Sequence, residues 1–361
     1  MGLRDIADVG VDQAEMSNVL YPVPENGTVY VAEDFGMGVS IGNNGRPLNT
    51  LLASLTTVEG VKKIIFGPGV YHFSTTINLK GLSDVSLCGS ASGETHFIFD
   101  SWISIFNMDE CTNIHINDLT FDFDPSPTIG GTIVSFNSTK KQIVIAVPQE
   151  FDLTDPLYNN GKISYGSYME FIYSESAKAY LPDPNGNLLY NSTGDSISNI
   201  SGGSYNPSTR ELTLSFVSMR NPTIGAHVSV AFTMYQYTGF VITDSAEIYL
   251  ESDTVYTTPG MTVRTVEVQN MYLNRFNVQL KEGSARLMTA TADIIHCVGN
   301  YGDLLISNSV FENSHDDALN ICSFYKTINS SLVHEIEASS AYYDTNVGIA
   351  KGDTLVVYDP K

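Results

Sequence analysis

The chain has 361 residues, a net charge of −22 at pH 7 and an apolar content of 42%. This length can bury a large core and exceeds that of most single compact domains. The acidic balance disfavours nucleic acid and anionic membranes as partners, because like charges repel. Charged residues amount to 16%, whereas 29 Gly, 20 Tyr and 17 Phe favour β-structure with many turns over helices.

No apolar run approaches the length needed to cross a bilayer, so we expect no membrane insertion. The first residues, "MGLRDIADVG", lack the apolar region of a signal peptide. Four cysteines are too few for a disulfide framework and fit no zinc spacing. They come in two pairs, 88/111 and 297/322, each separated by about the repeat length described next. This predicts stacked core thiols.

One pattern recurs along the chain: a β-rich run, a polar turn with Asn or Asp, and a second β-rich run. It is found at residues 62–73, 82–90, 113–124, 246–260, 265–276 and 303–314. The steps from Ile65 to Ser86 and from Ile248 to Val268 are 21 and 20 residues. Repeats of this kind are typical of parallel β-helix coils. We therefore expect an all-β fold in which residues one coil apart become neighbours at roughly 4.8 Å.

The middle of the chain departs from this pattern. Strands of period two, among them "KQIVIAVP" and "ELTLSFV", alternate with turn clusters such as "LPDPNGN". This indicates an inserted antiparallel β-barrel or sandwich. The predicted domains are 1–131 (first coils), 132–235 (insertion), 236–325 (coils with acidic residues) and 326–361 (the start of a second β-rich insertion). The pattern stops at Lys361 without the polar cap that a solenoid needs, so we expect a truncated chain.

Three aspartates are the strongest candidates for catalysis. Asp293 in "TADIIHC" and Asp316–Asp317 in "HDDALNIC" have similar surroundings and are 23 or 24 residues apart, about one coil. Stacking would bring the three carboxylates together, and their crowding would keep one protonated. Glycoside hydrolysis needs one protonated and one ionised carboxyl group. A bare Asp-Asp before a strand is more often a turn; the third acid one coil away favours a functional site.

The segment from Lys281 to Thr289 supports this interpretation, because it lengthens a coil beside the acids. Long loops on a rigid scaffold often carry substrate contacts. Within it, Arg286 either binds a sugar hydroxyl or pairs with Glu282. His315 either tunes the acid pair or caps the turn.

Two further residues are weaker candidates for a functional role. His296 lies on the side of Asp293 only if the register slips, so it is a weak candidate for substrate contact. Trp102, the single tryptophan, is predicted to pack in the core or at an edge rather than to form a sugar platform.

The order "YTTPGM", then "GSARLMTATADIIHCVGNYGDLLISNSVFENSHDDALNI", then "GDTLVVYDP" resembles glycoside hydrolase family 110, the α-1,3-galactosidases. The resemblance covers most of the chain and is most specific at residues 261–321. It implies a right-handed parallel β-helix with inserted β-barrels. It also implies exo-acting release of terminal α-1,3-linked galactose from blood-group-B-type or linear glycans, with inversion, in a secreted or periplasmic protein.

In this resemblance Asp316 corresponds to the general acid, and Asp317 and Asp293 share the general-base role. Arg286, His296 and His315 are further candidate substrate contacts. The implied partner is a galactose-terminated glycan, and no metal or organic cofactor is implied.

Two alternatives stay open. A polygalacturonase-like hydrolase places acids on adjacent coils in a similar way, but its "GHG" and "RIK" signatures do not occur here. Its polyanionic substrate also fits a chain of charge −22 poorly. A non-catalytic β-helix that binds glycans predicts surface aromatic residues and no carboxylate triad.

Overall fold

The computed structural model describes residues 26–90, 94–163, 166–191, 200–322, 326–332 and 335–340. Contacts divide the chain into two units, Met1–Ile321 and Cys322–Lys361. In the described part of the chain, no helix has the length and apolar character needed to cross a bilayer. The residues after 340, including "GDTLVVYDP", lie outside the described residues.

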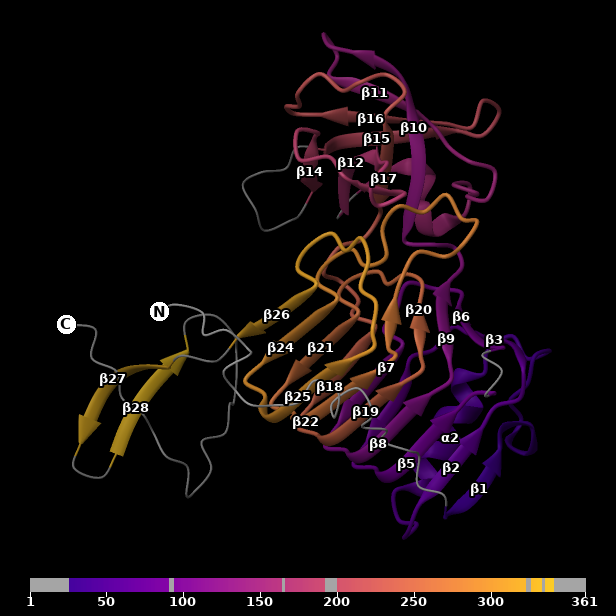
Figure 1. The fold of residues 1–361 in the computed structure, drawn as a ribbon, viewed down its shortest axis with the longest axis vertical. Helices are drawn as coiled ribbons and strands as arrows, with labels where there is room; N and C mark the ends of the chain where they lie inside the picture. Colours follow the sequence, from indigo (N-terminus) through magenta and orange to yellow (C-terminus); the bar gives the residue numbers. More distant parts are fainter. Residues whose placement is uncertain are drawn as a thin grey trace. The chain divides into compact units, whose positions relative to one another are not determined.

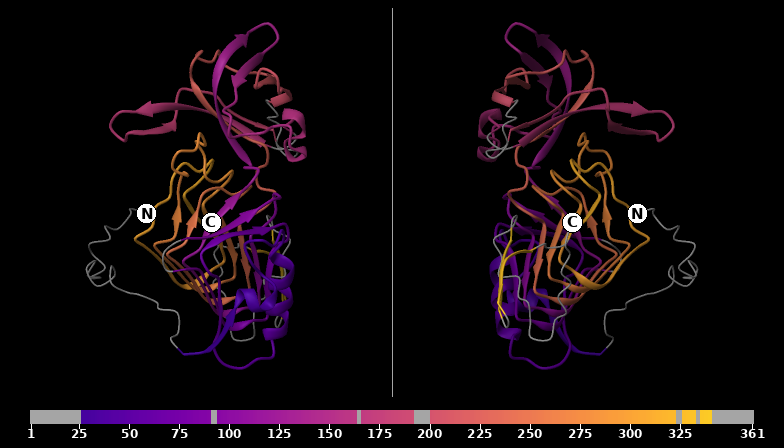
Figure 2. Two further views of the ribbon diagram at one scale, coloured as in Figure 1. Left: turned by 90° about the vertical axis from the view of Figure 1, so that its right-hand side faces the viewer. Right: turned by 90° about the vertical axis from the view of Figure 1, so that its left-hand side faces the viewer.

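Three parallel sheets form the scaffold of the first unit, and successive turns of the chain add one strand to each (Figures 1 and 2). The first sheet contains β1 (Thr28–Val31), β2 (Lys62–Ile65), β5 (Ser83–Cys88), β8 (Thr112–Asn117), β19 (Ala246–Glu251), β22 (Gln269–Asn274) and β25 (Tyr301–Ser307). The second contains β3 (Gly69–Phe73), β6 (Thr95–Phe99), β9 (Thr120–Phe123), β20 (Thr254–Val255) and β23 (Asn277–Val278). The third contains β4 (Ile77–Lys80), β7 (Phe106–Asp109), β18 (Phe240–Thr243), β21 (Val263–Val266), β24 (Ile295–Val298) and β26 (Leu319–Cys322). The expected all-β fold with stacked parallel strands is confirmed.

The register corrects the repeat length. Ile248 lies opposite Met271, and Ile65 lies opposite Cys88, so these coils advance by 23 residues rather than by 20 or 21. The sequence comparison had aligned hydrophobic residues two or three positions from their true partners, because several apolar residues in each repeat are interchangeable by type. The later coil is longer still, since Leu273 lies opposite Ile306, a step of 33 residues.

The polar turns of the repeat coincide with left-handed residues around strands of the first sheet. In β8, β19, β22 and β25, one such residue precedes the strand, one lies within it and one follows it, and β5 has the first two. The three positions are occupied by Gly81, Glu110, Asp244, Glu267 and Gly299; by Asp84, Asn113, Glu247, Asn270 and Gly302; and by Asp118, Ser252, Arg275 and Asn308. Gly, Asn and Asp tolerate this conformation best, which explains their recurrence. Side chains of the second set also join neighbouring coils, as Asn270 Nδ2 donates to Glu247 Oε1 at 2.6 Å.

The interior of the coils is filled with aromatic side chains stacked in register. Phe97 lies opposite Phe121, with ring centroids 5.7 Å apart, and Phe99 lies opposite Phe123 at 5.3 Å. All four are fully buried. Edge-to-face and tilted pairs of this kind add to the stabilisation from burial. The core thus fixes the coil-to-coil register on which the position of the acidic residues depends.

One helix, α2 (Gly45–Leu55), had not been predicted, because the composition favoured β-structure. Four leucines at positions 48, 51, 52 and 55 form its buried face. This spacing follows the helical period and was readable in the sequence. A short 3-10 helix, η2 (Ala32–Phe35), precedes it.

The insertion is an antiparallel sheet of eight strands, ordered β13-β12-β17-β10-β11-β16-β15 with β14 paired to β12. Its elements are β10 (Thr128–Asn137), β11 (Gln142–Ala146), η3 (Pro156–Gly161), β12 (Gly166–Ser174), β13 (Ala179–Pro182), β14 (Leu188–Asn191), β15 (Ile200–Asn206), β16 (Glu211–Phe216) and β17 (His227–Ala231). Antiparallel pairing was predicted, whereas closure into a barrel stays a prediction. In the second unit, β27 (Lys326–Leu332) and β28 (Glu335–Ser340) form an antiparallel pair.

The interpretation of the cysteines needs a correction. Cys88 lies opposite Asn117, so it is not stacked on Cys111, which lies before the next strand. Cys111 and Cys297 are buried, and Cys88 and Cys322 are partly exposed. Trp102 is buried as predicted, and its indole Nε1 donates to the carbonyl of Pro125 at 2.9 Å.

Candidate active site

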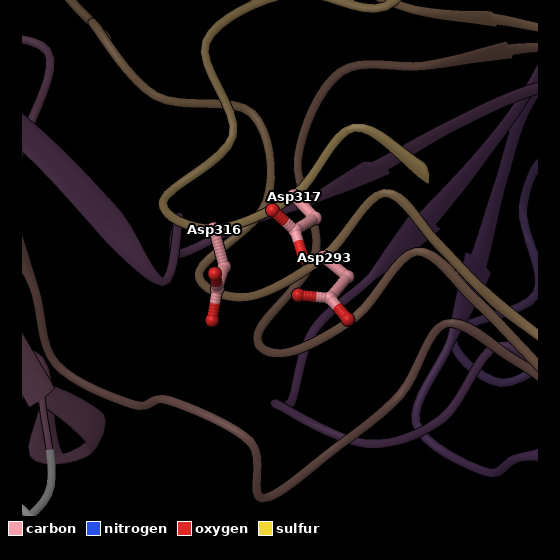
Figure 3. Close-up of side chains that lie close together, drawn as sticks. All are labelled: Asp293, Asp316 and Asp317. Atoms are coloured by element: carbon pink, nitrogen blue, oxygen red, sulfur yellow. The ribbon is translucent and has the colours of Figure 1, made fainter. Parts of the chain in front are cut away.

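The three aspartates lie together at the turns that lead into the third sheet. Asp293 precedes β24, and Asp316 and Asp317 precede β26. The backbone N–H of Ile294 donates to the carbonyl of Asp317 at 2.9 Å, which continues the parallel pairing of these strands into the turn. One oxygen of each carboxylate lies within 4.8 Å of the other two. Figure 3 shows the three side chains converging from two neighbouring turns.

Asp293 is the buried member of the group, and a histidine fixes its orientation. Its side chain is 4% exposed, and its Oδ2 lies 2.5 Å from Nδ1 of His296. The expectation that His296 lies away from Asp293 was therefore wrong, whereas its contact with substrate stays a prediction. Asp293 lies in the turn before the strand, where the alternation of strand faces that placed the two side chains apart does not apply, and a separation of three residues brings them together.

Asp316 and Asp317 are exposed, so a ligand can reach them. The hydroxyl of Tyr235 donates a hydrogen bond to Oδ2 of Asp316. Tyr235 follows the last strand of the insertion, and its backbone is left-handed, with φ of 57°. The insertion therefore takes part in forming the site. The sequence analysis missed Tyr235, because no motif or repeat relates it to Asp316.

His315 is buried beneath the exposed pair. Its imidazole Nδ1 lies 3.4 Å from Oγ of Ser167 on β12, and its backbone N–H donates to Ala290. Burial lowers the pKa of His315 from 6.5 to about 4, although the nearby Asp316 carboxylate acts in the opposite direction. The side chain is thus neutral at pH 7. Its side chain is 7% exposed, and its role as a substrate contact stays a prediction.

The low pKa of His315 predicts that folding stability depends on pH. Below pH 6.5 the unfolded chain takes up a proton that the folded chain excludes until about pH 4. Stability is therefore complete above pH 6.5 and falls towards pH 4, with a slope of up to about 1.4 kcal/mol per pH unit. We expect His315→Gln to flatten this part of a plot of unfolding free energy against pH. His96→Gln, at a half-buried histidine, is the control. Equal slopes in both variants would contradict the prediction.

The lengthened coil is confirmed, because its step of 33 residues exceeds the 23 of the preceding coil by ten. Its extra chain, residues 281–288, contacts the insertion: Ala285 N donates to Glu150 Oε1, and Thr128 Oγ1 donates to the carbonyl of Met288. Arg286 pairs with Asp122 of β9 at 2.5 Å, where the sequence had suggested Glu282. A role of Arg286 in substrate binding stays a prediction.

The same three aspartates are also the group best placed to hold a cation. In the described part of the chain, no other three His, Cys, Asp or Glu side chains bring ligand atoms within 4.8 Å of one another. Ca²⁺ takes six to eight oxygen ligands. Three carboxylates, two of them exposed, supply only part of that number.

The comparisons with known proteins give a weak match to a glycosidase. No protein-family model matches the chain. Over 122 residues it is 23% identical to α-1,3-galactosidase A of Shewanella woodyi (strain ATCC 51908 / MS32), a match that covers 31% of this chain and 20% of that protein.

Solved structures give distant likenesses. A candidate glycosyl hydrolase from Parabacteroides merdae ATCC 43184 is 10% identical, with 82% of this chain and 96% of that chain covered and a TM-score of 0.34. The A-module of the mannuronan C-5 epimerase AlgE4 from Azotobacter vinelandii is 12% identical, with 81% and 76% covered and a TM-score of 0.25. TM-scores of this size assign neither a fold nor a function to the chain. The chain thus shares weak sequence similarity with a curated α-1,3-galactosidase, over a fifth of that relative's length.

Proposed function

We propose that the chain is an exo-acting glycoside hydrolase that releases terminal α-1,3-linked galactose from glycans. The observation that carries the proposal is the group of three carboxylates from adjacent coils, one buried and two exposed, with oxygens within 4.8 Å of one another. The similarity to an α-1,3-galactosidase supports the choice of sugar and linkage. The right-handed sense of the coils, the closed barrel, the domain boundaries given above and a secreted or periplasmic location belong to the same proposal.

The proposed mechanism divides the work among the three acids. Asp316 protonates the glycosidic oxygen as the bond to the anomeric carbon breaks. Asp293 and Asp317 together hold a water molecule and remove its proton as it attacks that carbon. His296 orients the buried Asp293 carboxylate, and the Tyr235 hydroxyl holds Asp316 in place. A hydroxyl group both donates and accepts, so Tyr235 can stay bonded to Asp316 before and after proton transfer.

The stereochemical course is inversion in this proposal. The carboxyl groups of inverting enzymes are roughly 6.5–9.5 Å apart, and those of retaining enzymes roughly 5–5.5 Å. The nearest oxygens here lie within 4.8 Å, closer to the retaining range. Inversion therefore rests on the family resemblance rather than on the spacing, and the anomer of the product becomes the decisive measurement.

One screen tests the proposal against its alternatives. The full chain is incubated with galactosyl-α-1,3-galactose, with the blood-group-B trisaccharide and with polygalacturonate, and NMR follows the first-formed sugar. We expect β-galactose from one or both galactosides and no cleavage of polygalacturonate. First-formed α-galactose would show retention, and cleavage of polygalacturonate alone would favour the polygalacturonase-like alternative. Binding without turnover of any of the three would favour the glycan-binding alternative.

A further inference from the structure

A cavity of about 910 Å³ lies between the outer face of the second sheet and the insertion, and none of the three aspartates lines it. Its walls come from strands β3, β6 and β9, from residues 150–158 of the insertion and from residues 281–286 of the lengthened coil. Ligand pockets commonly have volumes of roughly 300–1,000 Å³. The proposed hydrolysis assigns no role to this space.

An ion-pair cluster forms part of the wall. Asp122, 3% exposed, accepts from Arg286 and from Lys281 Nζ at 2.9 Å. Arg286 is 10% exposed, and its Nε makes no hydrogen bond with any described residue. Nε is covered by protein atoms, so a ligand in the cavity cannot reach it. Lys281, whose side chain is 46% exposed, is the accessible cation of this wall.

Around this ion-pair cluster are carboxylates whose positions are fixed by neighbouring groups. Asp152 Oδ1 accepts from the N–H and hydroxyl of Thr154, Asp155 Oδ1 accepts from Leu157 N, and Glu150 Oε1 accepts from Ser284 and Ala285. Among the described residues, the second oxygen of each has no hydrogen-bond partner. A carboxylate that is already oriented and has one oxygen left can accept a hydrogen bond from a hydroxyl group of a ligand. Because its side chain is already ordered, binding costs little conformational entropy.

The charge and spacing of the lining groups limit the class of ligand. Acidic residues line the cavity at positions 122, 124, 150, 152, 155 and 282, against one lysine and one arginine, which disfavours an anion. The carboxylates are also too dispersed to share one cation, because no three of them bring oxygens within 4.8 Å. Between them lie apolar groups, including Val70, Ile98 and Phe151. A neutral ligand with many hydroxyl groups and C–H faces matches this pattern.

We propose that this cavity is a second saccharide site, which binds a neutral oligosaccharide away from the three aspartates. The choice of a saccharide among neutral polyhydroxyl ligands rests on the proposed function. The site binds without a chemical step, because its carboxylates accept hydrogen bonds from the hydroxyl groups of the sugar.

The fluorescence of Trp102 can report the binding of a ligand in this cavity. Trp102 is the single tryptophan of the chain, its Nε1 bonds to Pro125, and its ring meets that of Tyr158 edge to face at 5.6 Å. Pro125 and Tyr158 both line the cavity. A ligand in the cavity should therefore change the emission of Trp102. The titration uses the full chain with Asp316→Asn, so that no turnover occurs. The probe is a linear trisaccharide ending in α-1,3-galactose, and trilysine and CaCl₂ are tested beside it.

We expect a saturable change with the trisaccharide alone. Asp152→Ser with Asp155→Ser should raise the dissociation constant at least about tenfold, because serine keeps the local acceptor but removes the oxygen offered to the ligand. The control is Asp183→Ser, since Asp183 accepts from Asn185 N in the same local way but lies outside the cavity. It should change the dissociation constant by less than about twofold. Matching melting temperatures establish that the variants are folded.

Three results would overturn the proposal: no saturable change with the trisaccharide, saturation by trilysine or calcium instead, or equal affinity in the double variant and the control. The proposed hydrolysis fails separately, if the unmodified chain releases no galactose. A chain that binds the trisaccharide at Trp102 but does not cleave it would refute the proposed function and leave the saccharide site standing.

Discussion

Asp316→Asn is expected to lower the rate of galactose release from galactosyl-α-1,3-galactose by about 10²–10⁴-fold, the usual contribution of a general acid. The amide keeps the size of the side chain and an acceptor for Tyr235, but it cannot protonate the departing oxygen. Initial rates of the full chain, compared with those of the unmodified protein, measure the effect. Asp303→Asn is the matched control, because Asp303 is exposed on β25 and lies outside the three-carboxylate group.

A second substrate separates the acid from the base. 2,4-Dinitrophenyl α-galactoside has a leaving group that departs without protonation, so Asp316→Asn should slow its hydrolysis far less than that of the disaccharide. Asp293→Asn should slow both substrates alike, since attack by water still needs a base. Equal losses on both substrates in Asp316→Asn would assign Asp316 to the base role. An unaffected rate on the disaccharide would remove Asp316 from the mechanism.

The acidic group was predictable because its members are separated by about one coil. The coil that carries them has a matching step, because the backbone N–H of Ile294 donates to the carbonyl of Asp317, 23 residues further along the chain. The repeat length read from apolar residues was too short. The acids gave the better estimate, because they mark one particular turn, whereas apolar residues occupy several positions in each coil.

The contacts from the insertion could not be predicted. Tyr235 is 81 residues from Asp316, and Ser167 is 148 residues from His315. No repeat relates these pairs, since the insertion has its own antiparallel register and reaches the coils through tertiary packing. Its Met169 and Phe171 pack with Leu287 and Met288 of the lengthened coil in a separate buried cluster. Local sequence patterns predicted the parallel sheets and the group of acids. The contacts that the insertion makes with the site could be seen only in the structure.

The ion pair between Asp122 and Arg286 joins β9 to the lengthened coil, and its loss should have the largest effect on stability. Asp122→Asn keeps the shape of the side chain but leaves a guanidinium that is 10% exposed without its counter-charge. Removing one partner of a buried pair typically costs about 3–5 kcal/mol. Urea unfolding of the full chain at pH 7 measures this cost. Asp109→Asn is the control, because Asp109 pairs with Lys80, which is 71% exposed, and exposed pairs contribute about 0–1 kcal/mol.

A double variant tests whether the loss of stability in Asp122→Asn arises from the unpaired guanidinium of Arg286. Asp122→Asn combined with Arg286→Met removes both charges and should be more stable than Asp122→Asn alone, because no unpaired guanidinium remains. If Asp122→Asn costs no more than Asp109→Asn, the charge of Arg286 is balanced without Asp122. The guanidinium would then be available to a ligand in the cavity, and the role of Arg286 in substrate binding would gain weight over its role in joining the coils.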